Sequence, residues 1–162
     1  MIMTASGIFW GTTLNWEEAV RKTLDEKALI IRTAWLYSGH GNNFVKTMLN
    51  LMKEKPSLNV IDEQIGLPTW AYGLVHAIWT ALEKKILGTF HWTDAGVASW
   101  YDFAVAIQEE GIQTGLLDIA IPILPVPTLQ YPNPCRVSLI KHPSGRQSIP
   151  NPFTGVLNFD PC

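Results

Sequence analysis

Histidine, serine and cysteine are among the side chains of this 162-residue chain that could serve as nucleophiles, bases or metal ligands. Ser144 stands close to His142, but no G-x-S-x-G turn, which exposes the nucleophile of a hydrolase, surrounds it. The four histidines lie far apart and form neither an H-E-x-x-H motif nor an i, i+4 pair suited to zinc. We therefore expect neither a hydrolase triad nor a metal site.

Trp35 is a candidate for ligand contact because it lies near the end of an apolar run, A-L-I-I-R-T-A-W-L-Y, at residues 28–37. The run is rich in strand formers and predicts a strand buried on both faces of a parallel sheet. Open α/β sheets bind ligands at the carboxyl ends of their strands. Trp35 is therefore expected either to line a pocket or to be one more aromatic residue of the core.

Strands and helices are expected to alternate over the first 115 residues, which indicates an α/β fold with a largely parallel sheet. The expected strands are 28–37, 58–62 and 89–92. The expected helices are 15–27, 43–53, one that runs from a Thr69 cap to Lys85, and one that Ser99 and Asp102 open as a capping box.

Caps and apolar stripes support these helices. Asn15 with Glu18 predicts a capping box for the first helix, and Asn43 predicts a cap for the second. The first helix has a stripe of Trp16, Ala19, Val20 and Leu24, and the third has Trp70, Ala71, Leu74, Val75, Ile78, Trp79 and Leu82.

Beyond about residue 115 the sequence changes character. Residues 118–135 hold five of the eleven prolines, which excludes a regular helix or an inner strand there. Residues 137–162 are rich in turn residues and are expected to form an irregular tail. We nevertheless expect a single domain over residues 1–162, because this length suffices for a core of its own.

Composition excludes several classes of function. A net charge of −2 and the lack of a basic stripe argue against nucleic acid as a partner. No apolar run approaches the roughly 20 residues of a membrane span, and no basic segment precedes an apolar one as in a signal peptide. Cys135 and Cys162 are too few for a disulfide scaffold. These features together favour a cytoplasmic protein.

Five blocks carry a resemblance to a known family: R-T-A-W-L-Y-S, N-N-F-V-K-T-M-L, D-E-Q-I-G-L-P-T, S-W-Y-D-F-A and Y-P-N-P-C-R. Their order and spacing over residues 11–136 resemble the dTDP-4-dehydrorhamnose reductases, a family of extended short-chain dehydrogenases. The resemblance implies a partial Rossmann-like parallel sheet with flanking helices, plus the small substrate-side region of such enzymes. It covers only the second half of the family pattern, so the N-terminal dinucleotide-binding half with its G-x-G-x-x-G turn is expected to be missing.

The family's catalytic helix carries a Y-x-x-x-K pair that this chain does not have. On the resemblance, the tyrosine place is Phe9 and the lysine place is Thr13. The aspartate usual after P-T-x-A-x is Gly73. Phe9 has no acidic hydrogen, and the loss of a positioned general acid costs roughly 10²–10⁴ in rate. Which residue could replace that acid is unknown; water or another tyrosine, such as Tyr37, are the alternatives.

The substrate side of the family pattern survives better. In the resemblance, Trp35 contacts the nucleotide-sugar, and Asn43 and Phe44 border the same pocket. The turn from Gln64 through Pro68 to Thr69 also borders it. The implied ligand is a small-molecule carbonyl or a nucleotide-sugar, and the implied cofactor is NADH or NADPH.

Three functions of different classes follow from the resemblance. The first is an NAD(P)H-dependent oxidoreductase that reduces a ketone without the usual Tyr and Lys. The second is a non-catalytic module that binds a sugar-nucleotide. The third is a truncated structural remnant of the family.

A homo-oligomer, most simply a two-fold dimer, is also expected. Without the absent half, the strand at 28–37 would lie at a sheet edge and expose unpaired backbone groups. Either a second copy or the N-terminal segment M-I-M-T-A-S-G-I-F would then cover that edge.

Overall fold

The computed structural model describes residues 2–5, 10–130 and 156–158, which form two compact units. The first unit contains residues 2–5, 10–36, 67–96 and 156–158, and the second contains residues 37–66 and 97–130. Each unit is described by itself, and the single domain expected over residues 1–162 stays a prediction. The expected irregular tail lies outside the described residues except for one short strand.

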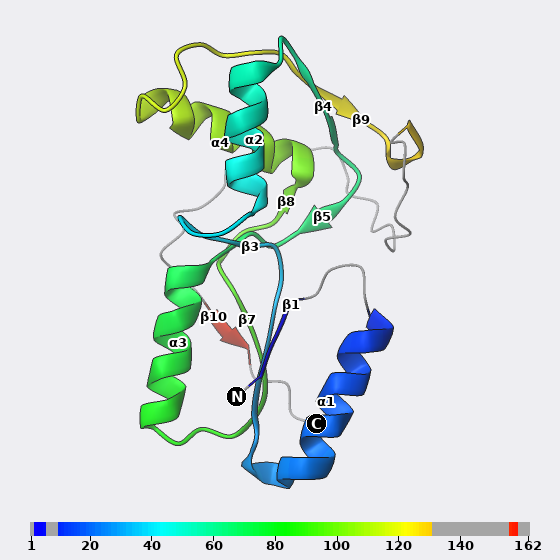
Figure 1. The fold of residues 1–162 in the computed structure, drawn as a ribbon, viewed down its shortest axis with the longest axis vertical. Helices are drawn as coiled ribbons and strands as arrows, with labels where there is room; N and C mark the ends of the chain where they lie inside the picture. The colour runs from blue at the N-terminus through cyan, green and yellow to red at the C-terminus, as the bar shows by residue number, and fades with distance from the viewer. Residues whose placement is uncertain (1, 6–9, 131–155, 159–162) are drawn as a thin grey trace. The chain divides into compact units, whose positions relative to one another are not determined.

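The first unit is built on a four-stranded sheet in the order β1-β2-β7-β10 (Figure 1). Its strands are β1 (Ile2–Ala5), β2 (Leu29–Thr33), β7 (Gly88–Thr93) and β10 (Val156–Asn158). The strands β1, β2 and β7 run parallel, and β10 pairs with β7 in the antiparallel sense. The α/β fold with a largely parallel sheet is therefore confirmed.

Two helices cover opposite faces of this sheet, α1 (Trp10–Leu24) and α3 (Ala71–Glu83), as Figure 1 shows. Side chains alternate along β2, so Leu29 and Ile31 pack with α3 while Ile30 packs with Val20 of α1. The first unit thus has three layers, with β2 buried between its two helices.

The N-terminal segment occupies one side of β2. Ile2 pairs with Ile30 and Ala5 with Thr33, while β7 pairs along the other side of β2. Because β2 has a neighbour on both sides, it is not the exposed edge strand on which the expectation of an oligomer rested. Of the two covers considered for that edge, the structure has the N-terminal segment.

The expected single strand at 28–37 is wrong, because the backbone turns at Trp35. Trp35 has a φ of 44°, in the left-handed region that interrupts a strand, and β3 (Leu36–Tyr37) begins after it. The Trp35 carbonyl oxygen accepts a hydrogen bond of 3.1 Å from the N–H of Thr69, in β6 (Thr69–Trp70). The strand therefore ends in a turn that a distant segment holds.

The expected start of the first helix is wrong, and of its expected apolar stripe only Val20 is buried. Helix α1 begins at Trp10, so Asn15 lies within it and does not cap it, and a 3₁₀ turn (Asp25–Lys27) follows. Trp16 is 66% exposed, whereas Glu17 is only 4% exposed. The helix turns this face inward because the Glu17 carboxylate has a partner on the sheet.

Helix α3 departs from its expected cap and stripe. Trp70, not Thr69, is its N-cap residue, and the helix ends at Glu83 before Lys85 takes a left-handed φ of 52°. Leu74, Ile78 and Ala81 are buried, as a helix packed on one face of a sheet requires. The rest of the expected apolar stripe includes exposed side chains, namely Val75, Trp79 and Leu82.

The second unit pairs α2 (Phe44–Glu54) with α4 (Trp100–Gln113) beside short two-stranded sheets. The strand pairs are β4 (Leu58–Ile61) with β9 (Ile123–Val126), and β5 (Ile65–Gly66) with β8 (Ala98–Ser99); a 3₁₀ turn (Thr128–Gln130) follows β9. The proline-rich β9 has one partner in this sheet, as the sequence requires. The Asn43 cap and the Ser99–Asp102 capping box are confirmed.

Close packing joins α2 to α4 in the second unit. A Cβ added at Gly111 of α4 would lie 3.1 Å from a methyl carbon of Leu49 in α2 and 2.9 Å from one of Leu117. Glycine at this position therefore lets the two helices approach. Among the helices that the structure describes, none has the length and apolar character that a membrane crossing needs.

Candidate functional site

The turn after β2 holds Trp35 in an uncommon conformation. A non-glycine residue in the left-handed region costs roughly 1–2 kcal/mol, so the surrounding contacts must hold it there. One such contact is the Thr69 N–H that donates to the Trp35 carbonyl oxygen. Thr69 is fully buried, and its hydroxyl donates to the Leu67 carbonyl oxygen at 3.1 Å. Two of the predicted residues, Trp35 and Thr69, are thus in direct contact through their backbones.

Asp94 is a residue of this region that sequence reasoning missed. It directly follows β7 and is 6% exposed, and its Oδ2 accepts a 2.7 Å hydrogen bond from the N–H of Trp70. Burial raises the pKa of the Asp94 carboxyl, and the Trp70 hydrogen bond opposes that shift. The available signal was its place: an acidic residue directly after a strand lies at the sheet edge where ligands bind.

Three predicted residues gather in the second unit. Asn43 caps α2 by accepting from the Lys46 N–H at 3.2 Å, and its Nδ2 donates to the Ser38 carbonyl oxygen at 2.7 Å. The ring of Phe44 lies 4.5 Å from the ring of Trp100, centroid to centroid. The backbone N–H of Trp100 in turn donates to the Gln64 carbonyl oxygen at 3.3 Å. Phe44 and Gln64 therefore both contact Trp100, while Asn43 caps the helix that begins at Phe44.

The cluster around Trp100 extends through further aromatic rings of the second unit. Phe44 stacks on Phe103 at 5.5 Å, and Tyr37 meets Phe103 edge-on at the same distance. Phe103 is buried, while the other three rings are partly exposed. Partly exposed aromatic rings offer apolar surface of the kind against which a planar base or a sugar ring can pack. Sequence reasoning placed Trp100 and Phe103 only in the helix that the Ser99–Asp102 capping box opens and in the family block S-W-Y-D-F-A.

The six predicted substrate residues are therefore divided between the two units. Trp35, Pro68 and Thr69 belong to the first unit, and Asn43, Phe44 and Gln64 belong to the second. That all six line one pocket stays a prediction. Phe9 lies outside the described residues, and Thr13 lies within α1.

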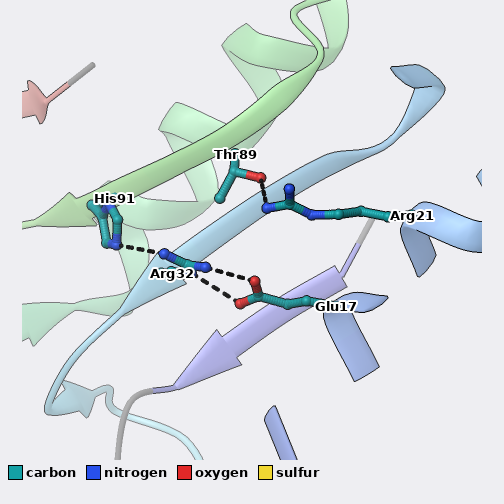
Figure 2. Close-up of polar contacts among 5 residues, drawn as sticks. All are labelled: Glu17, Arg21, Arg32, Thr89 and His91. Carbon is teal, nitrogen blue, oxygen red and sulfur yellow. Dashed lines mark hydrogen bonds and ion pairs between the residues drawn. The ribbon is translucent and has the colours of Figure 1, made fainter. Parts of the chain in front are cut away.

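A second polar cluster ties α1 to the sheet (Figure 2). Arg32 on β2 donates from Nε and Nη2 to the two carboxylate oxygens of Glu17, at 2.9 and 2.7 Å. The Nη1 of Arg32 lies 3.4 Å from His91 Nε2, and Arg21 donates to the Thr89 hydroxyl at 3.1 Å. The Arg32 hydrogen bonds outweigh burial and lower the pKa of the Glu17 carboxyl.

This cluster is suited to fixing the helix, because Arg32 and Glu17 satisfy each other in a bidentate pair. Glu17 lies one helical turn after Thr13, so the pair sets the position of the helix at the place of the family lysine. Sequence reasoning missed it, since Arg32 was placed in an apolar run and the expected buried stripe of the first helix did not include Glu17. Within the described residues, no group of three or more His, Cys, Asp or Glu side chains is placed to hold a metal ion.

A parallel sheet between two helices, with polar turns after β2 and β7, defines a partial Rossmann-like α/β protein. Residues 6–139 match the family model described as the RmlD substrate binding domain, and the chain belongs to that family. The resemblance to dTDP-4-dehydrorhamnose reductases is thereby confirmed.

Relatives of known function agree with this assignment. The chain is 41% identical to the dTDP-4-dehydrorhamnose reductase of Escherichia coli K12 over 134 residues, which are 80% of this chain and 44% of that enzyme. The chain thus spans less than half the length of that relative.

Solved structures of the same enzyme are also similar. The structure from Bacillus anthracis, in complex with NADP, has a TM-score of 0.68 at 34% identity and covers 79% of this chain and 43% of its own. The structure from Clostridium acetobutylicum has a TM-score of 0.68 at 37% identity and covers 85% of this chain and 49% of its own.

Proposed function

We propose that this chain binds a nucleotide-linked sugar that carries a ketone, and that it acts as the substrate-binding part of an NADH- or NADPH-dependent reductase. The observation that carries the proposal is the match of residues 6–139 to a substrate binding domain. The Trp35 turn of the first unit and the Trp100 cluster of the second unit support it, because each contains residues predicted to border the ligand. The relatives' names make a dTDP-sugar the ligand to test first.

Ketone reduction needs a hydride at the carbonyl carbon and a proton at the carbonyl oxygen. In this chain the places of the family tyrosine and lysine are Phe9 and Thr13, neither of which supplies an acid of suitable pKa. The role left to the described residues is to bind and orient the substrate. We therefore expect turnover by this chain alone to be slow.

The described residues do not fit the pyrophosphate of a nicotinamide dinucleotide. Such a group needs a glycine-rich turn between a strand and a helix N-terminus, and the 162 residues contain no G-x-G-x-x-G. The proposal of NADH or NADPH as cofactor therefore rests on the relatives, one of which was solved in complex with NADP. We also propose a cytoplasmic location and homo-oligomeric assembly.

Isothermal titration calorimetry of the purified chain with dTDP tests the binding proposal directly. We expect saturable binding that a dTDP-linked 4-keto sugar strengthens and that ADP does not reproduce. Absence of dTDP binding would reject the proposal.

Oxidation of NADPH or NADH in the presence of the keto sugar then separates two of the functions. Turnover above the rate without protein supports the reductase, whereas binding without turnover supports the non-catalytic module. The replacement of Tyr and Lys by Phe9 and Thr13 favours the second outcome.

A further inference from the structure

Helices α3 and α4 each begin directly after a short strand, β6 and β8 respectively. In the two helices the backbone N–H of the N-cap residue finds its hydrogen-bond acceptor in different ways. In α4, the N-cap Ser99 N–H donates to Asp102, which is the third residue of the same helix, at 3.0 Å. In α3, the third residue is Gly73, and the N-cap Trp70 N–H instead donates to Asp94 at 2.7 Å. A carboxylate 24 residues away thus performs the role that the third helical residue performs in a capping box.

We propose that Asp94 is a positioning residue for Trp35, and that glycine at position 73 is what allows the Asp94 carboxylate to take this place. All of the residues involved belong to the first unit. The link from Asp94 to ligand binding rests on the proposed function, in which Trp35 contacts the substrate.

The contacts run from Asp94 to Trp35 in two steps through adjacent residues. Asp94 Oδ2 accepts from the Trp70 N–H, and the neighbouring Thr69 N–H donates to the Trp35 carbonyl oxygen at 3.1 Å. Asp94 and Thr69 are both buried, so water cannot readily replace either bond. Fixing Trp70 therefore fixes Thr69, and Thr69 holds Trp35 at its left-handed φ of 44°.

The space around Gly73 shows why the two positions are coupled. A Cβ built on Gly73 lies 3.6 Å from Asp94 Oδ1, which is ordinary van der Waals contact. A methyl group would fit there, but a carboxylate on that Cβ would place two negative charges side by side at one helix N-terminus. Only one of the two positions can therefore hold the carboxylate that accepts from the Trp70 N–H.

A four-protein cycle tests this coupling: the unchanged chain, Asp94→Ala, Gly73→Asp, and the double variant. The melting temperature and the indole N–H cross-peak of Trp35, assigned by Trp35→Phe, are measured for each protein. Asp94→Ala should lower the melting temperature by about 3 °C and shift the Trp35 cross-peak. Gly73→Asp alone should also lower the melting temperature. The double variant should recover most of the melting temperature and return the cross-peak toward its original position.

Two control variants separate charge and hydrogen bonding from bulk. Gly73→Ala adds only the Cβ and should leave both readouts close to those of the unchanged chain. Asp94→Asn keeps an oxygen that can accept from the Trp70 N–H, so it should preserve the Trp35 cross-peak. A double variant no better than Asp94→Ala, or an Asp94→Ala protein whose Trp35 cross-peak does not move, would overturn the proposal.

Binding of dTDP to the same proteins gives an independent third readout. We expect Asp94→Ala to weaken binding several-fold and the double variant to restore it. Unchanged affinity in Asp94→Ala would overturn the link between Asp94 and the ligand. If the unchanged chain does not bind dTDP, the proposed function fails, while the melting temperature and the Trp35 cross-peak still decide the role of Asp94.

Discussion

The Glu17–Arg32 pair shows at the level of residues how a buried charge can orient a helix. The Glu17 side chain is 5% exposed and that of Arg32 is 34% exposed, so the carboxylate is the member that depends on its partner. A buried charge without its partner is strongly destabilising, whereas the intact pair itself contributes little net stability. The pair therefore matters for the placement of α1 more than for the total stability.

Replacing Glu17 with glutamine should lower the free energy of unfolding by about 2 kcal/mol. The effect lies below the usual range for a buried pair because Arg32 retains access to water. Urea unfolding followed by circular dichroism measures it. Glu18→Gln is the matched control, because Glu18 is exposed and its contact with Lys22 is 3.9 Å, so its loss should change little.

The same pair predicts the direction of a pH effect. The pKa of Glu17 is lowered in the folded state, so its contribution to stability is complete above its ordinary value of about 4.5 and declines as the pH falls below that value. Comparing unfolding free energies at successive pH values from neutral to acidic should show a smaller acid-induced loss in Glu17→Gln than in the unchanged chain. An equal loss in both proteins would contradict the assignment.

Trp35 allows side-chain and backbone effects to be separated. Trp35→Ala removes the indole but keeps the cost of a left-handed φ, whereas Trp35→Gly removes both. We expect both variants to weaken dTDP binding by roughly tenfold, which corresponds to about 1.4 kcal/mol. The glycine variant should be about 1 kcal/mol more stable than the alanine variant in urea unfolding. Equal dTDP affinity in Trp35→Ala and the unchanged chain would place Trp35 outside the ligand site.

At the level of elements, what could be predicted from the sequence depended on how far apart the partners lie. The caps at Asn43 and Ser99 bond within three residues of themselves, so local spacing reveals them. The N–H of Trp70, the N-cap residue of α3, is bound by Asp94, and the inward face of α1 is set by Arg32 on β2. Such partners lie 24 and 15 residues away, and no local period encodes them.

The capping box of α4 gives a prediction at this scale. Ser99 accepts from the Asp102 N–H at 3.0 Å and also donates to the Asp102 carboxylate at 2.7 Å. Ser99→Ala should therefore lower the free energy of unfolding by about 1 kcal/mol. Ser57→Ala, at an exposed serine ahead of β4, is the matched control and should stay within about 0.5 kcal/mol of the unchanged chain. A Ser99→Ala effect as small as that of the control would contradict the capping role.

At the level of the whole molecule, the family and the α/β class followed from sequence blocks, while the division into two units did not. The chain leaves the first unit after Leu36, returns at Leu67, and leaves again after Gly96, so each unit is assembled from segments far apart in the sequence. Neighbours in the sequence can belong to different units: Gln64 lies in the second unit and Pro68 in the first. The spacing of the predicted substrate residues therefore could not reveal which of them share a unit. The cover that β1 provides for β2 also depends on pairing between distant segments.

If the chain forms a homo-oligomer, its interface is not an exposed edge of β2, because β2 pairs with β1 on one side and with β7 on the other. On α3, an exposed stripe is formed by Tyr72, Val75, Trp79 and Leu82, and Trp79 is 64% exposed. These positions recur at helical spacing, so they form one apolar strip along the helix. Covering even a few hundred Å² of such surface would stabilise an assembly by several kcal/mol.

We therefore expect the chain to elute as a dimer at tens of micromolar, with its mass measured by light scattering on a sizing column. Val75→Glu and Trp79→Glu each place a charge in the stripe and should shift the mass to that of one 18.1 kDa chain. Thr80→Glu is the matched control, since Thr80 is exposed on the same helix but about a quarter turn away from the stripe. A monomer in the unchanged protein would contradict the oligomer prediction, whereas a dimer that survives both stripe variants would place the interface elsewhere.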